Sequence, residues 1–358
     1  ILSAGEEFLD PSKSMDVPFM PSWKRVISAV PDILHRLREA VEEDRLEFGS
    51  EIVLNPSQHT KAKGFRQRVA FHVKEIYGDE DMDEITDELM ETANMSEHAS
   101  PPALAKSKWD QSDVMMVTYG DSIKKEGRPP LRELNNFMVS QLKNTMSGVH
   151  ILPFNPYSSD DGFSVIDYTT VNPALGSWDD ITAIGNELSV MADLVINHCS
   201  RESFWFKNYE KNKAPGRGYF INGSEFEDLS QVVRPRSTPL LTEVDAVDGI
   251  KQVWCTFGED QVDLNYRNPD VLLEIVRIIR QYVEQGIRFF RLDAIAFLWK
   301  ESGTTCVHLP QTHELIKLLR LIIENLDPSA VIITETNVPN RENLSYFGND
   351  NEAHLIYN

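Results

Sequence analysis

The chain has 358 residues, and its 35 Lys and Arg against 56 Asp and Glu give a formal net charge of −21 at neutral pH. This charge excludes proteins that grip nucleic acid or anionic membranes over a broad basic face, because such binding needs clustered positive charge. A hydrophobic content of 41% and a charged content of 25% are typical of a folded protein. The three cysteines, Cys199, Cys255 and Cys306, are widely separated and odd in number, which indicates reduced thiols rather than disulfides or a zinc site.

No stretch of the sequence approaches the roughly 18 consecutive apolar residues of a membrane span. The first ten residues lack the basic start and apolar run of a signal peptide. We therefore expect a cytoplasmic protein with no membrane or nucleic-acid partner. The oligomeric state is left open.

Residues 1–107 are predicted to form a helical N-terminal segment that ends in a linker. Apolar residues recur with helical spacing over residues 23–47 and again over residues 65–95. The acidic run at residues 79–87 is expected to be a solvated helix start rather than a metal site, because its carboxylates alternate with apolar residues. The Pro- and Ser-containing stretch at residues 96–108 is typical of a linker.

From residue 108 to residue 358 short apolar strands alternate with amphipathic helices, which predicts a parallel sheet covered by helices. The strands are expected at residues 114–120, 148–154, 189–198, 286–294 and 330–336, and the helices at residues 131–146, 178–188, 269–284 and 313–326. Such a pattern fits either an open wound sheet or a (β/α)8 barrel of the TIM type. Residues 199–260 are too long for an ordinary loop and are expected to form an inserted subdomain after the third strand.

Polar side chains at the ends of three strands favour the barrel. Asn197 and His198 end the third strand, Arg291 and Asp293 the fourth, and Glu335 the fifth, and the carboxyl ends of barrel strands meet at one mouth where chemistry is placed. No glycine-rich phosphate loop follows the first strand, as a dinucleotide fold would require.

Asp293 and Glu335 form the candidate catalytic pair. Carboxyls on neighbouring strands about 4.8 Å apart can approach the roughly 5–5.5 Å separation of retaining glycosidases, in which one attacks the sugar and the other protonates the leaving oxygen. Arg291, two residues earlier on the same side of the strand, can keep Asp293 ionised. The alternative is a buried Arg–carboxylate pair that only stabilises the sheet.

Five motifs together resemble those of the α-amylase superfamily of glycoside hydrolases. They lie at residues 148–153, 193–198, 261–265, 286–294 and 334–335. The resemblance implies that Asp293 is the nucleophile, Glu335 the general acid/base, Arg291 the residue that orients Asp293, and His198 a ligand of a glucosyl hydroxyl. Asp193 and Asn197 would tie the third strand to the insert. No surrounding carboxylate cluster accompanies Asn197, so no metal and no other cofactor is predicted.

Residues 152–168 and 335–347 are most similar to the sucrose phosphorylase branch of this superfamily. In that branch an Asp three positions before a Phe holds the far glucose hydroxyls and the Phe is a stacking platform, which implies these roles for Asp160 and Phe163. Such a closed cup suits a small glucoside better than a polymer. The alternative is that residues 158–161 form only a polar turn.

Two arginines in the insert stand out in this acidic chain. Arg234 and Arg236 flank a proline at residue 235, and a guanidinium is suited to phosphate or carboxylate. The stretch resembles the acceptor loop of phosphorylases that act on sucrose 6-phosphate or glucosylglycerate. The alternative is a surface turn with two solvated arginines.

One expected feature of the family has no counterpart. The third carboxylate, an Asp after a His at the end of a seventh strand, is absent, and the last predicted strand is the sixth, at residues 354–357. We therefore expect an incomplete barrel in a fragment of a longer enzyme or a truncated reading frame, prone to aggregation because its edges are open.

The predicted function is that of a retaining α-glucosyl phosphorylase that transfers glucose from a small glucoside to inorganic phosphate, its co-substrate. The alternatives are an α-glucoside hydrolase or transglucosidase of the same family and a catalytically inactive fragment.

Overall fold

A computed structural model describes residues 64–95 and 108–357. The chain divides into two compact units, residues 1–56 and 57–358, and all described residues belong to the second unit. The helix predicted at residues 23–47 and most of the predicted linker therefore lie outside the described residues. No helix among those described is long and apolar enough to cross a membrane.

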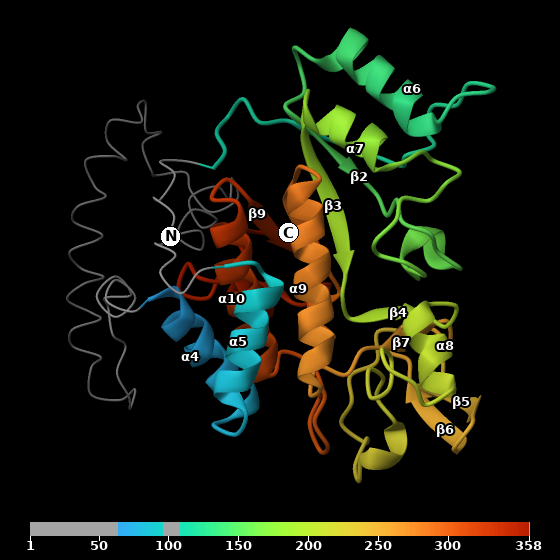
Figure 1. The fold of residues 1–358 in the computed structure, drawn as a ribbon, viewed down its shortest axis with the longest axis vertical. Helices are drawn as coiled ribbons and strands as arrows, with labels where there is room; N and C mark the ends of the chain where they lie inside the picture. Colours follow the sequence, from blue (N-terminus) through green and yellow to red (C-terminus); the bar gives the residue numbers. More distant parts are fainter. Residues whose placement is uncertain (1–63, 96–107, 358) are drawn as a thin grey trace, which may run out of the picture. The chain divides into compact units, whose positions relative to one another are not determined.

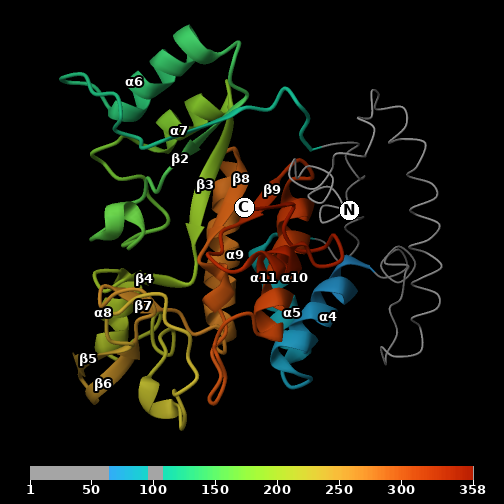
Figure 2. The ribbon, with the colours of Figure 1, turned by 180° about the vertical axis from the view of Figure 1, so that it is seen from behind.

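Six parallel strands form one curled sheet (Figures 1 and 2). In spatial order they are β1 (Met115–Thr118), β2 (Gly148–Ile151), β3 (Ser189–Val195), β8 (Ile287–Asp293), β9 (Val331–Thr334) and β10 (Leu355–Ile356). Each pairs in parallel with the next. The five strands and the short sixth strand predicted from their apolar runs are all confirmed, with ends up to three residues shorter.

The helices of the sheet begin where proline or a capping side chain favours a first turn. They are α6 (Pro130–Phe137), continued by a π-helical turn (Met138–Leu142), α7 (Trp178–Gly185), α9 (Pro269–Glu284) and α10 (Pro310–Leu326). Three of them start with proline at a first helical position, which lacks an N–H that would otherwise be unpaired. Ser177 and Asp180 form a capping box at the start of α7. The predicted helix at residues 131–146 therefore changes form at residue 138.

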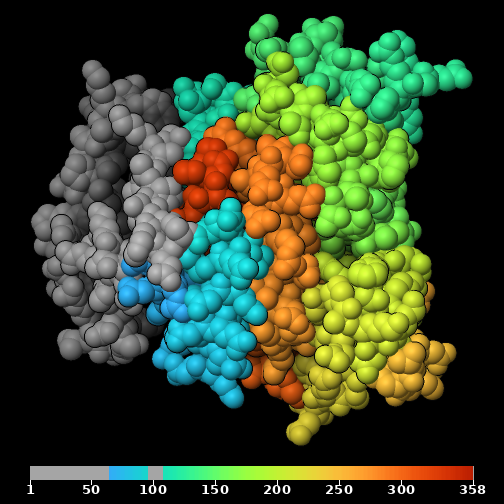
Figure 3. Space-filling view, viewed as in Figure 1, coloured from blue at the N-terminus to red at the C-terminus, as the bar shows by residue number. Residues whose placement is uncertain are grey.

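The helical pattern at residues 65–95 contains two helices, α4 (Phe65–Tyr77) and α5 (Met82–Thr92). The chain turns between them at Gly78, whose φ of 88° suits glycine. The acidic run is exposed and starts α5, as predicted, and Arg66 pairs with Asp83 and Asp87 at 3.0 and 2.7 Å. Helix α4 packs on α10 and α5 on α9, and Figure 3 shows α5 and α9 side by side on one face.

The insert leaves the barrel at the end of β3. It contains β4 (His198–Ser200), α8 (Phe204–Glu210), a hairpin of β5 (Leu241–Ala246) and β6 (Gly249–Trp254), and a return strand β7 (Gln261–Asp263) that pairs antiparallel with β4. The three cysteines are buried free thiols, two of them in or beside these strands. Because β4 and β7 pair, the first and last residues of the insert lie side by side, beyond the C-terminal end of β3.

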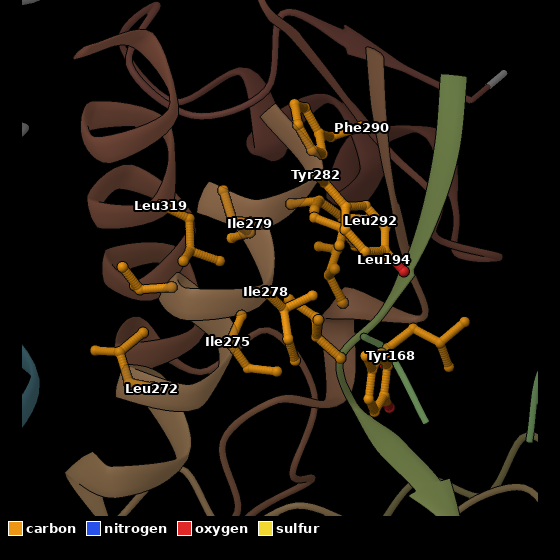
Figure 4. Close-up of a cluster of buried hydrophobic side chains, with 14 of the residues drawn as sticks. Tyr168, Leu194, Leu272, Ile275, Ile278, Ile279, Tyr282, Phe290, Leu292 and Leu319 are labelled. Atoms are coloured by element: carbon orange, nitrogen blue, oxygen red, sulfur yellow. The ribbon is translucent and has the colours of Figure 1, made fainter. Parts of the chain in front are cut away.

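The core fills the space between the sheet and its helices. Figure 4 shows outward-facing Leu194, Phe290 and Leu292 of the strands against Ile275 and Ile279 of α9, all fully buried. A second, smaller cluster lies on the inner face of the sheet and includes Met191, Phe289 and Val331. Alternation of side chains along each strand thus separates an outer face bound to helices from an inner face that carries the polar groups described next.

Candidate active site

The candidate catalytic carboxyls lie side by side at the carboxyl ends of β8 and β9. Leu292 is paired with Thr334, so the residues that follow, Asp293 and Glu335, reach the same level of the sheet. Glu335 accepts a hydrogen bond from the Ala294 N–H at 3.1 Å, which aims its side chain at the end of β8. This is the arrangement that the sequence predicted for the two groups, whose catalytic roles remain a prediction.

Arg291 connects the two carboxyls. Its Nη1 donates to Asp293 Oδ1 at 2.9 Å, and its Nη2 lies 3.9 Å from Glu335 Oε2. Asp293 is only 8% exposed. Burial raises its pKa to about 7, with a smaller increase from Glu335 and Asp193, while Arg291 opposes the change. A carboxyl whose pKa is raised strongly by burial beside specific charged partners is a candidate for a catalytic role.

Asp193 belongs to the same network and not to the insert. Its Oδ1 accepts from Arg291 Nη1 at 2.5 Å, and its Oδ2 lies 2.8 Å from Nε2 of the buried His150. The prediction that Asp193 ties β3 to the insert is therefore wrong, because its side chain points to the inner face of the sheet. The sequence interpretation assigned no role to His150, although this polar residue stands in an apolar strand within the motif at residues 148–153.

The predicted glucose-binding residues come together beside this pair. His198 Nε2 lies 3.0 Å from the carbonyl oxygen of Phe163, and the Gln261 amide donates to Asp160 Oδ2 at 2.8 Å. The Arg291 guanidinium lies 5.5 Å from the centre of the Phe163 ring. Burial lowers the pKa of His198, so the ring is neutral near pH 7. Gln261, which the sequence interpretation did not single out for a role, thus links β7 to the predicted cup.

The loop that carries Asp160 has an unusual backbone. Asp160, Asp161 and Gly162 have φ values of 55°, 51° and 110°, a region that side chains other than glycine adopt at a cost. At Gly162 an added Cβ would lie 2.7 Å from the Cβ of Pro153, so only glycine fits. Asp260 at the end of the insert stabilises the loop from outside and accepts hydrogen bonds from residues 158, 159 and 164.

The side-chain oxygen of Asn197 accepts a hydrogen bond from a lysine ammonium. Lys300 Nζ donates to Asn197 Oδ1 at 3.0 Å and pairs with Asp263 Oδ2 at 2.6 Å, with both charged side chains buried. Asn197 also donates to Asp263 at 3.0 Å, which ties β3 to the insert as predicted. Within residues 64–95 and 108–357 no group of three or more His, Cys, Asp or Glu side chains is arranged to hold a metal.

Arg234 and Arg236 lie on the loop between α8 and β5, the first half-buried and the second exposed. Arg234 donates to the carbonyl of Thr238, while its buried Nε has no partner. Neither arginine forms an ion pair with a carboxylate in the described part of the chain. The N–H of Val233 donates to Thr305 O at 3.0 Å, which fixes this loop to the segment after β8.

Residues 142–358 match the family model described as the alpha amylase catalytic domain. The chain belongs to the alpha-amylase family. The resemblance drawn from its five motifs is thereby confirmed. A solved structure of this fold, the sucrose 6F-phosphate phosphorylase of Thermoanaerobacter thermosaccharolyticum, is 24% identical, with a TM-score of 0.64 over 72% of this chain and 54% of that one. The prediction of an incomplete (β/α)8 barrel is confirmed as well.

Several of the curated relatives that the chain matches are phosphorylases, and one is a trehalose synthase. The glucosylglycerate phosphorylase of Spirochaeta thermophila is 52% identical over 248 residues, which are 69% of this chain and 42% of that protein. The sucrose phosphorylase of Streptococcus mutans is 35% identical over 203 residues, 53% of this chain and 41% of that protein. The chain thus spans about two fifths of the length of these relatives.

Proposed function

We propose that this chain carries the catalytic pair of a retaining α-glucosyl phosphorylase. The observation that supports this most directly is the placement of Asp293 and Glu335 on adjacent strand ends around one guanidinium. The relatives named as glucosylglycerate and sucrose phosphorylases support the choice of reaction.

The reaction proceeds in two displacements at the anomeric carbon. In the first, an oxygen of ionised Asp293 bonds to that carbon while the glycosidic bond breaks and Glu335 gives its proton to the departing oxygen. In the second, a phosphate oxygen bonds to the same carbon, Asp293 leaves as a carboxylate, and Glu335 recovers a proton from phosphate. Two inversions retain the α configuration, and the product is α-glucose 1-phosphate.

Phosphate dependence tests the reaction class. The full-length protein is incubated with glucosylglycerate, sucrose 6-phosphate or sucrose, with and without inorganic phosphate, and glucose 1-phosphate and free glucose are measured. We expect glucose 1-phosphate only with phosphate. Equal release of free glucose in both cases would support a hydrolase instead, and no release from any glucoside would support an inactive chain.

The carboxyl roles have a separate test. Asp293→Asn is expected to abolish turnover, because an amide cannot form the glucosyl ester. Glu335→Gln is expected to slow the transfer of poor leaving groups far more than that of good ones, because only poor leaving groups need the acid. A trapped glucosyl adduct on another residue would refute the assignment.

We propose further that Arg234 binds an anionic acceptor such as glycerate or a sugar phosphate, with Arg236 beside it. The unpartnered buried Nε of Arg234 in a chain of net charge −21 supports this. Replacing either arginine by Ala should weaken the use of anionic acceptors by roughly 1.5–3 kcal/mol, the contribution of a hydrogen bond to a charged group. The exposed Arg217 of the same insert, replaced by Ala, is the matched control. An equal loss with neutral fructose would contradict this assignment.

We also propose that the protein works in the cytoplasm. The three buried free thiols support this compartment, since it keeps cysteines reduced.

A further inference from the structure

A chain of four side chains crosses the inner face of the sheet beneath the candidate catalytic pair. It runs from His150 on β2 through Asp193 on β3 and Arg291 on β8 to Asp293, with contacts of 2.8, 2.5 and 2.9 Å. His150 is 2% exposed and the Asp193 side chain is fully buried. Nothing in the proposed reaction uses His150, so its burial next to a carboxylate needs an explanation.

The strand register accounts for the direction of His150. His150 is paired with Met191, and Met191 shares a face with Asp193 two residues along β3. Met191 packs in the inner cluster of the sheet, whereas Val149, next to His150, packs in the outer core. His150 therefore reaches upward along the inner face to Asp193.

In the contact between His150 and Asp193, the histidine is the hydrogen-bond donor. Asp193 is paired with Arg291 at 2.5 Å, and an ionised carboxylate only accepts hydrogen bonds. His150 Nε2 consequently donates to Oδ2, while Arg291 Nη1 donates to Oδ1. Each oxygen of Asp193 has one donor, which fixes the carboxylate in one place.

Asp193 and Asp293 share one guanidinium nitrogen, whose two N–H groups can each serve one carboxylate. Arg291 Nη1 donates to both, at 2.5 Å to Asp193 and at 2.9 Å to Asp293. Any change that makes Asp193 more dependent on Arg291 withdraws charge compensation from Asp293. A donor on the far side of Asp193 has the opposite effect, because it satisfies part of that carboxylate independently of Arg291.

We propose that His150 is a positioning residue that, by holding Asp193, leaves Arg291 available to orient and ionise Asp293. The proposal rests on the function proposed above and assigns the histidine no contact with substrate. Removal of the donor is expected to draw Arg291 toward Asp193 and to move the acid limb of the activity to higher pH, since Asp293 then loses part of its cation.

None of the other described titratable groups that face this network takes over the role of His150 as the second donor to Asp193. Those with an electrostatic interaction with Asp193 or Asp293 come from the segment after β1, the loop between β2 and α7, α9, the residue after β9 and the segment after β10: Tyr119, Tyr168, Tyr282, Glu335 and Tyr357. Burial raises the pKa of each of these tyrosines, so they stay neutral in the acid limb. Glu335 is a carboxyl group and cannot act as a cation.

The test compares two substitutions at one position. His150→Leu removes the donor, and His150→Gln retains an amide N–H the same number of bonds from the backbone as Nε2. We follow fluoride release from α-glucosyl fluoride by the full-length protein from pH 5 to 8, and measure kcat and KM. His150→Leu is expected to lower kcat about tenfold near pH 6 with little change in KM, as a shift of the acid limb by about one pH unit would, and His150→Gln to recover most of the loss.

Val149→Ala is the matched control, because Val149 is equally buried in the same strand but faces the outer core. The proposal would be overturned if the acid limb of His150→Leu coincided with that of wild type. It would also be overturned if His150→Gln lost as much kcat as His150→Leu. If the wild type releases no fluoride and makes no glucose 1-phosphate, the proposed function fails separately. Titration of ¹³C-labelled Asp293 by NMR in wild type and His150→Leu then decides the inference alone, which an unchanged titration would refute.

Discussion

Asp293 is expected to destabilise the folded protein at neutral pH. Its pKa is raised from 3.8 to about 7, chiefly by burial. The folded state therefore binds this proton more tightly than the unfolded chain, and wild type loses stability relative to Asp293→Asn as the pH rises from about 4 to 7. One pH unit corresponds to about 1.4 kcal/mol, so the full window sets an upper limit of roughly 4 kcal/mol.

Urea unfolding at pH 5, 6 and 7 measures this difference. We expect the stability of Asp293→Asn relative to wild type to increase by about 2 kcal/mol between pH 5 and 7. Asp245→Asn on the exposed side of β5 removes the same formal charge at the surface and is the control. If Asp293→Asn is more stable than wild type by the same amount at all three pH values, the reasoning is refuted. The cost of burying a carboxylate must grow with pH, because it arises only when Asp293 is ionised.

Three further predictions concern stability and are measured by the same unfolding assay. Lys300→Met leaves the buried Asp263 without its cation and should cost about 3–5 kcal/mol; a loss below 1 kcal/mol would show that another donor replaces the ammonium. Ile279→Ala removes a fully buried side chain between α9 and the sheet and should cost roughly 2–5 kcal/mol, whereas a neutral effect would mean that the core closes over the cavity. Ser203→Ala removes the side chain that accepts from the Phe206 N–H at the start of α8 and should cost about 1 kcal/mol, and an unchanged stability would indicate that water caps the helix equally well.

The strands and the candidate pair were predictable because both depend on local sequence. An apolar run between helical patterns specifies a buried parallel strand, and a carboxylate directly after the run falls at the mouth. Asp293 and Glu335 follow this rule. The break of the 65–95 pattern was less evident, since a single glycine at residue 78 interrupts a helical repeat that continues on both sides.

The polar network was largely hidden because its members are distant in the sequence. His150 and Asp193 are 43 residues apart, and Lys300 and Asn197 are 103 apart. A histidine within an apolar strand does not reveal which face it occupies without the register of its neighbour. A lysine after a strand likewise gives no sign of burial, because lysine is almost always exposed unless a partner from elsewhere neutralises it. Contacts of this kind depend on how the strands are arranged in the barrel and not on the local sequence around each residue.

The hydrogen bonds between Asp260 and the loop at residues 158–164 have a consequence for exchanging inserts between related proteins. One carboxylate oxygen at the end of the insert accepts hydrogen bonds from Ser158, Ser159 and Ser164. The left-handed turn that presents Asp160 is therefore shaped by the insert as well as by its own sequence. Grafting an insert from a relative in order to change the acceptor would also shift Asp160 and so alter binding of the donor sugar. To avoid this, the loop with the three serines and residue 260 have to be transferred together.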